Sequence, residues 1–175
     1  MTANPGIVGG YNFGVRLVET AKPASALVGA FNPPIVAGFS ECSGLEATMA
    51  VDEWREGGRN DAVLRFPGRV THPTIKLRRG LAVSTELWDW HEQFLLGRGR
   101  RRDGVIDLLD DTGQAVRTWR FRRGLITKWS GPALNALSSA VAIEEVEITH
   151  EGLFVQAGGA FGEALSTIAS IFGGS

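Results

Sequence analysis

The chain has 175 residues, of which 43% are hydrophobic and 21% are charged, and its formal net charge is −1. This length suits one domain whose core needs no disulfide or metal, and the composition excludes wholesale disorder. The near-zero net charge provides no global field that would attract nucleic acid or an acidic membrane. Cys42 is the single cysteine, which excludes an intrachain disulfide and a cysteine zinc cluster.

The first ten residues, MTANPGIVGG, lack the basic segment and the continuous apolar run of a signal peptide. The longest mildly apolar stretch, 24–39, contains Asn32, Pro33 and Pro34, so it is not expected to span a bilayer as a helix. We therefore expect the protein to fold in a reducing cytoplasm and to insert into no membrane by itself.

Strands dominate the prediction. Apolar and polar residues alternate in short segments, and turn formers such as Gly57-Gly58, Pro67-Gly68 and Gly131-Pro132 separate them. Residues 21–34 are predicted as a loop, and Asp110–Gly113 as a hairpin connection. The predicted strands are 12–20, 35–42, 45–54, 62–66, 73–79, 104–109, 114–122, 124–130 and 139–150.

The stretch of residues 40–61, SECSGLEATMAVDEWREGGRND, predicts a long strand with two unlike faces. Leu45, Ala47, Met49 and Val51 fall on one side and polar residues on the other, which is the period of a half-buried strand. The strand ends in a bulky, charged tip and then breaks at two glycines. Such a tip suits either a catalytic group or a contact between subunits.

One helix is predicted within residues 83–99, VSTELWDWHEQFLLGRG. Ser84 or Thr85 can cap its start, and Gly97 suits its end. The helix should cover one face of the sheet system with an apolar stripe at three- and four-residue spacing. The stripe comprises Leu87, Trp90, His91, Phe94 and Leu95.

The last predicted strand, 139–150, has an irregular pattern. Val141 and Ile143 share one parity, whereas Val146 and Ile148 share the other. We therefore expect either a bulge near Glu144-Glu145 or an exchange of the covered face along the strand.

A second, short amphipathic helix is predicted near the end of the chain, after the break at Gly158-Gly159. Its stripe would be Phe161, Leu165, Ile168 and Phe172, and it would need a surface to pack on.

No motif predicts an enzyme. His72, His91 and His150 have no ligand partner at metal-binding spacing, so neither a metal nor a cofactor is expected. Cys42 is better explained as a small buried residue than as a nucleophile. The arginine run 98–102, with Arg78-Arg79 and Arg122-Arg123, leaves two interpretations open. One is a nucleic-acid contact, and the other is a solvated loop after the helix or one side of an intersubunit salt-bridge set.

Several motifs occur in a characteristic order between residues 11 and 153. They are FSECSGL at Phe39–Leu45, EWREGGRN at Glu53–Asn60, Pro67-Gly68, IKLRRG at Ile75–Gly80, WDW at Trp88–Trp90, DDTG at Asp110–Gly113 and EITHEG at Glu147–Gly152. In kind and order they resemble the tail tube family of contractile phages, which is shared with phage-tail-like contractile injection systems.

The resemblance implies a mainly β fold, a β-sandwich or barrel-like subunit with one α-helix, that is structural and not an enzyme. Hexameric rings would join their inner sheets and stack into a hollow conduit that sheath contraction drives through a target envelope. The implied partners are copies of the chain, the sheath protein, baseplate and spike proteins, a tube terminator and effector cargo in the lumen. Assembly would be cytoplasmic, and the product would be part of a phage tail or an injection particle, extracellular after release.

The same resemblance implies that the tip of the long strand reaches neighbouring subunits or rings. The expected subunit interface comprises Trp54, Arg55, Glu56, Gly57, Gly58, Arg59 and Asn60.

The expected domains are a tail-tube-like β domain over residues 1–153 and a C-terminal extension over 154–175. The extension and the long 21–34 loop depart from the family pattern. They leave open whether the chain is a main tube subunit, a baseplate-proximal initiator or a specialised terminal ring. An arginine-rich nucleic-acid-binding module is the alternative from another class.

Overall fold

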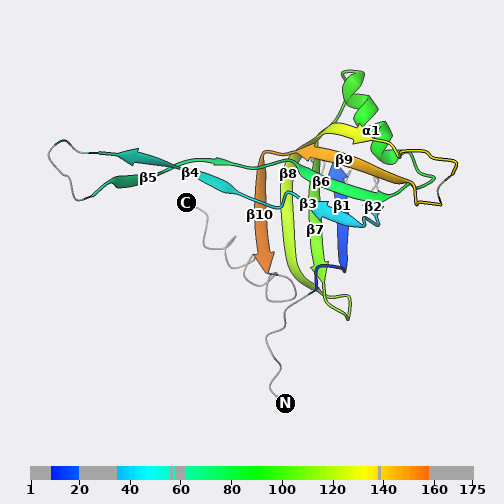
Figure 1. The fold of residues 1–175 in the computed structure, drawn as a ribbon, viewed down its shortest axis with the longest axis horizontal. Coiled ribbons are helices and arrows are strands. Elements are labelled where there is room, and N and C mark those ends of the chain that lie inside the picture. The colour runs from blue at the N-terminus through cyan, green and yellow to red at the C-terminus, as the bar shows by residue number, and fades with distance from the viewer. Residues whose placement is uncertain (1–8, 20–34, 56, 58–61, 138, 158–175) are drawn as a thin grey trace, which may run out of the picture.

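The computed structural model describes residues 9–19, 35–55, 57, 62–137 and 139–157 (Figure 1). The predicted 21–34 loop and the predicted helix over 161–172 lie outside these residues. In chain order the elements are β1 (Phe13–Glu19), β2 (Ile35–Ala37), β3 (Glu41–Ser43), β4 (Thr48–Trp54), β5 (Leu64–Thr71), β6 (Ile75–Gly80), α1 (Glu86–Leu95), β7 (Arg102–Leu109), β8 (Ala115–Ser130), β9 (Ile143–Thr149) and β10 (Gly152–Ala157). The prediction of a mainly β fold with one helix is confirmed.

Most strands form one antiparallel path in the order β2-β1-β7-β8-β9-β6-β3, and β10 also pairs with β8. Strand β8 belongs to both halves of the fold, because its first part pairs with β7 and β10 and its last part pairs with β9. In the described residues the path ends at β2 and β3, so it forms a sandwich-like body and no closed barrel.

Two predicted strands, 114–122 and 124–130, are one continuous strand in the structure. Arg123 has a positive φ of 53° inside β8, at the point where the strand exchanges partners. The sequence pattern breaks there because the buried side changes, although the backbone continues. The predicted strand 35–42 is instead divided into β2 and β3, and β10 was not predicted.

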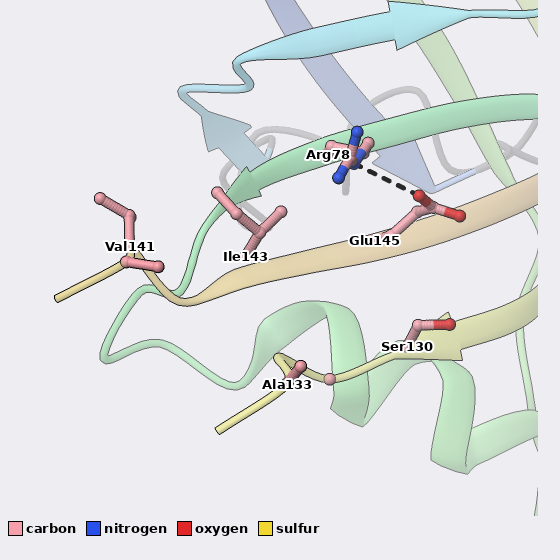
Figure 2. Close-up of a pocket in the computed structure, with 8 residues that line it drawn as sticks. Arg78, Ser130, Ala133, Val141, Ile143 and Glu145 are labelled. Carbon is pink, nitrogen blue, oxygen red and sulfur yellow. Dashed lines mark ion pairs between the residues drawn. The ribbon is translucent and has the colours of Figure 1, made fainter. Parts of the chain in front are cut away.

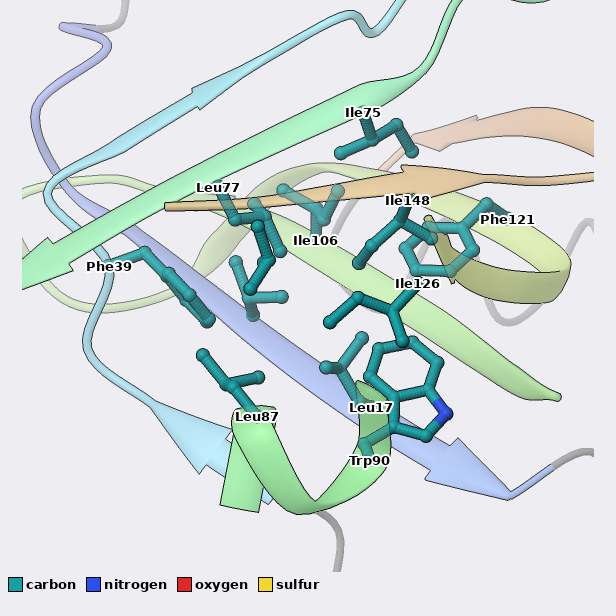
Figure 3. Packing of buried hydrophobic residues seen from close by; sticks show 12 residues of the cluster. Leu17, Phe39, Ile75, Leu77, Leu87, Trp90, Ile106, Phe121, Ile126 and Ile148 are labelled. Carbon is teal, nitrogen blue, oxygen red and sulfur yellow. The ribbon is translucent and has the colours of Figure 1, made fainter. Parts of the chain in front are cut away.

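The core lies between the two halves of the body, and α1 contributes two large side chains to it (Figure 3). Leu87 and Trp90 are almost completely buried, and Trp90 Nε1 donates a hydrogen bond to the Arg100 carbonyl at 2.9 Å. The predicted helical stripe is therefore partly wrong, since Leu95 is 67% exposed. Phe94, in the last turn of the helix, is partly buried and packs against the core, whereas Leu95 beside it faces away. The core residues are Val15, Leu17, Phe39, Ile75, Leu77, Leu87, Trp90, Ile106, Phe121, Ile126, Val146 and Ile148.

The helix ends as predicted at Gly97, which has a φ of 71°. The Gly97 N–H donates to the Phe94 carbonyl at 3.1 Å, and the Arg98 N–H donates to the Gln93 carbonyl at 3.0 Å. This pair of bonds is a Schellman motif, which satisfies carbonyl groups that the helix leaves open.

The predicted bulge or face exchange near Glu144-Glu145 is wrong. Strand β9 pairs with β6 in uninterrupted register from Ile143 to Ile148, and Glu144, Val146 and Ile148 share its buried face. The pattern of apolar residues gave the wrong prediction because a carboxylate, that of Glu144, occupies a core position. Glu144 accepts hydrogen bonds from Arg79 Nε and, at 3.1 Å, from Trp129 Nε1. Val141, which suggested the change of parity, precedes the strand.

We expect Glu144→Ala to lower the free energy of unfolding by about 3–5 kcal/mol, because the buried Arg79 guanidinium would lose its charged partner. Glu145→Ala on the same strand is the matched control, since its ion pair with Arg78 is solvent-accessible. That control should cost about 1 kcal/mol or less. Urea unfolding at neutral pH measures both variants, and equal losses would contradict the prediction.

Two glycines make room for the Phe121 ring where β8 exchanges partners. A Cβ atom at Gly104 would lie 2.0 Å from the Phe121 ring, and one at Gly124 would lie 2.6 Å from it. The Gly124 position is also 2.8 Å from the Arg102 carbonyl oxygen, which belongs to the backbone and cannot easily move away. The Phe121 ring therefore occupies a slot that a side chain at either glycine position would fill.

We expect Gly124→Ala to destabilise the protein by about 1–3 kcal/mol through this overpacking. Gly14→Ala in β1 is the control, because an added Cβ there meets no atom of the described residues within 4 Å. The control should change stability by roughly 0.5 kcal/mol or less. Thermal or urea unfolding of both variants tests the slot, and a neutral Gly124→Ala would refute it.

Candidate assembly surface

Strands β4 and β5 form a separate two-stranded sheet that projects from one end of the body (Figure 1). We call residues 48–71 the arm, and all of them except 56 and 58–61 are described. Every residue of β4 is exposed. A two-stranded hairpin is marginally stable in water without a surface to pack on, so the arm by itself is an incomplete structure.

Both faces of the arm carry large apolar side chains. Met49 lies opposite Val70 on one face, and Trp54 and Phe66 lie on the other. Met49 and Phe66 are each 52% exposed, and Trp54 is 63% exposed. The prediction of a half-buried strand is therefore wrong for the single chain, because neither face of β4 is covered.

The arm is bent by a β-bulge at Pro67-Gly68, where a turn was predicted. The register passes from Met49 opposite Val70 to Val51 opposite Pro67, so β5 holds one extra residue in this interval. The proline is tolerated because the arm has no further strand beside β5 among the described residues. A Cβ at Gly68 would lie 3.0 Å from the Ala50 carbonyl oxygen, which explains the glycine.

The predicted interface residues lie at the free end of the arm. Trp54, Arg55 and Gly57 are exposed in the chain, whereas Glu56, Gly58, Arg59 and Asn60 lie outside the described residues. The sequence did not single out Met49, Phe66 and Val70 as surface residues. Alternation of polar and apolar side chains marks a two-faced strand, but it does not tell whether its own chain or another molecule covers the apolar face.

A second surface feature is the edge formed by β10. Within the described residues this strand pairs with β8 on one side only. Its Phe154 and Val155 are exposed, and the Arg122 guanidinium lies 4.6 Å from the centre of the Phe154 ring. An open edge is able to pair with a strand of another chain. The predicted domain boundary at residue 153 falls inside this strand.

A shallow hollow of about 420 Å³ lies where β8 and β9 diverge (Figure 2). Arg78 and Glu145, 3.4 Å apart, form an ion pair on its wall, and Arg78 also pairs with Glu41. The described residues hold no group of three or more histidine, cysteine or acidic side chains able to bind a metal. Burial raises the pKa of Cys42 to about 11, so its thiol stays protonated at neutral pH.

The arginine clusters are engaged inside the chain. Arg101 and Arg123 both pair with Glu151, at 3.2 and 2.8 Å, and Arg102 lies over the Trp90 ring. Arg79 is buried against Glu144. These ion pairs lie within one chain and not between subunits. In the part of the chain that the structure covers, no helix has the length and apolar character needed to cross a membrane.

A family model described as T4-like virus tail tube protein gp19 matches residues 11–154. The chain is also similar to solved structures of contractile injection systems. A chain of the anti-feeding prophage baseplate is 24% identical with a TM-score of 0.74, covering 89% of this chain and 98% of that chain. A chain of the PVC sheath-tube complex in the extended state is 25% identical with a TM-score of 0.72, covering 87% and 93%.

A third structure, of the PVC sheath/tube terminator in the extended state, has a chain that is 26% identical with a TM-score of 0.71, covering 90% of this chain and 100% of that chain. No curated protein matches the chain significantly in sequence.

Proposed function

The chain belongs to the family of T4-like virus tail tube proteins and is a structural tube subunit, and from this premise we propose that the arm joins copies of the chain within that tube. The observation that supports the proposal is the arm itself, a hairpin whose apolar side chains lie open on both faces. Contact with other copies would remove this surface from water at roughly 25 cal/mol per Å² of apolar area.

The proposed contact has its polar part at the tip, where the interface would comprise Trp54 to Asn60. Arg55 and the acidic residue beside it, Glu56, supply opposite charges that fix the orientation of a docking partner. Trp54 supplies a large ring of the kind that dominates binding energy at interfaces. Met49, Phe66 and Val70 extend the contact along the arm.

Ring closure would use the edges of the body. The half of the sandwich that contains β2, β1, β7, β8 and β10 has β2 at one edge and β10 at the other. Pairing the β10 edge of one copy with the β2 edge of the next copy would make a heterologous, head-to-tail contact. Such a contact closes into a ring when the rotation between copies allows it. We propose hexameric rings with joined inner sheets, which also removes the open edges that promote aggregation.

The complete apparatus would add partners of other kinds. We propose a sheath protein around the tube, baseplate and spike proteins at its tip, a tube terminator at its far end and effector cargo in the lumen. Solved relatives include chains from a sheath-tube complex, a baseplate and a terminator. The chain would assemble in the cytoplasm, act without catalysis and transmit the push of the contracting sheath.

We expect the purified chain to form tubes visible by negative-stain microscopy. Arg55→Glu combined with Glu56→Arg should reduce tube number at least tenfold. The reversed charges at the tip of the arm would face residues of neighbouring copies whose own charges are unchanged. Met49→Ser with Phe66→Ser should act similarly by removing apolar contact area. Both variants should unfold at the wild-type urea midpoint, since Met49, Arg55 and Phe66 are exposed in the chain.

The control is Glu92→Arg with Arg98→Glu, an equal exchange of charge at exposed residues of α1 and the turn after it. It should form tubes normally. Normal tubes from either arm variant would refute the role of the arm. Tube length separates the open alternatives, because a main tube subunit gives long tubes whereas an initiator or terminal ring gives single rings or short stacks.

The C-terminal extension is proposed as a docking segment with a short amphipathic helix that suits a specialised ring. Since β10 continues to Ala157, truncation after that residue removes residues 158–175 of the extension without breaking a strand. We expect the truncated chain to keep its fold and to lose part of its assembly or baseplate loading. If it melts, assembles and loads like the full chain, the extension is dispensable.

A further inference from the structure

Two histidines join the root of the arm to the core of the body. His72 follows β5, and its Nδ1 lies 3.3 Å from the carbonyl oxygen of Glu46, which precedes β4. A carbonyl oxygen only accepts hydrogen bonds, so Nδ1 of His72 carries the proton. This bond connects the two chain segments at which the arm leaves the body.

His150 lies between this root and the core. Its ring centroid is 5.3 Å from that of His72 and 5.8 Å from that of Phe121, the ring held in the glycine slot of β8. The side chains therefore form a row of tilted rings, with interplanar angles of 41° and 40°, that runs from the arm to the point where β8 exchanges partners. Only 8% of His150 is exposed, and neither ring nitrogen makes a hydrogen bond of normal geometry within the described residues.

Among the titratable groups of the described residues, none that acts on His150 favours a positive charge there, whereas backbone groups of Gly152 and Pro73 do favour it. Glu151, its neighbour in the chain, pairs with Arg101 and Arg123. Glu46 contributes its main-chain carbonyl to the row of rings, and β8 contributes the apolar Phe121 ring. Among the titratable groups, the one that acts on His150 is His72, and its charge would repel a second cation.

We propose that the His72–His150 pair is an acid-sensitive lock that holds the arm against the body when both rings are neutral and releases it when they are protonated. Protonation of both rings would place two positive charges on rings whose centroids lie 5.3 Å apart, with His150 8% exposed and His72 partly exposed, so the repulsion is screened less than it would be in bulk water. The arm is the element that yields, because β4 and β5 have no other strand beside them among the described residues whereas His150 is packed on the core.

The titration of His150 supports the direction of the effect. Burial lowers the pKa of His150 below its ordinary value of 6.5, the charge of His72 acts in the same direction, and backbone groups of Gly152 and Pro73 act against it. In the unfolded chain His150 would bind a proton near pH 6.5. Neutral His150 therefore stabilises the fold fully above that pH, and this contribution is lost as the pH falls through 6.5 toward the lower folded-state pKa of His150.

Spin-label distance measurements test the lock in the full chain. Labels at Glu53→Cys on the arm and Gln114→Cys on the body, in a Cys42→Ser background, report the distance between the arm and the body directly. Dilution with unlabelled chain restricts the signal to distances within one copy. We expect the width of the distance distribution to increase at least twofold from pH 7.5 to pH 5.0. In the His150→Phe variant the distribution should stay narrow at both pH values.

His91→Phe is the matched control, because it removes a partly buried histidine of α1 and should widen at pH 5.0 like the parent. An unchanged width in the parent, or equal widening in His150→Phe, overturns the proposal. If His150→Phe does not fold, His72→Gln replaces it. Its amide keeps a donor for the Glu46 carbonyl, so a pH 5.0 width as large as that of the parent also overturns the lock. Because the distances are intramolecular, the result does not depend on whether the arm joins copies in a tube.

Discussion

The exchange of partners along β8 is the constraint on which the rest of the structure depends. One strand of 16 residues pairs with β7 and β10 and then with β9, and it turns between them at Arg123 and Gly124. The turn creates the slot for Phe121, and the Phe121 ring supports His150. The rings of Phe121, His150 and His72 then lead from this point to the root of the arm.

The body and the arm obtain their stability from different sources. Among the described residues, the core of the body comprises 12 buried apolar residues from both halves of the sandwich and from α1. The arm buries little within its own chain, although it carries Met49, Trp54 and Phe66. A protein that keeps such a surface open loses the free energy that burial would provide until a partner arrives. This division allows subunits to fold before they assemble.

The sequence predicted the strands well where one face is buried by the chain itself. Ile75 and Leu77 in β6 alternate with exposed residues, and the pattern agrees with the strand. The prediction failed at Glu144, because a pattern of apolar positions assigns every carboxylate to the surface. Glu144 is buried, and its carboxylate accepts hydrogen bonds from Arg79 and Trp129. The prediction also failed at Pro67-Gly68, where a turn was expected and β5 continues through both residues. A strand with no further partner can hold a proline and a bulge that would be excluded from the middle of a sheet.

The interface could be placed from sequence only through the family resemblance, and the physical reason lies in the arm. Alternation in residues 45–54 indicates a strand with an apolar face, and it carries no information on which molecule covers that face. The structure adds that Met49 and Val70 are neighbours across the arm and that both stay open. The described residues of the body already form a core without the arm, so this face is free to bind another molecule. We propose that other copies of the chain cover it and thereby complete the arm.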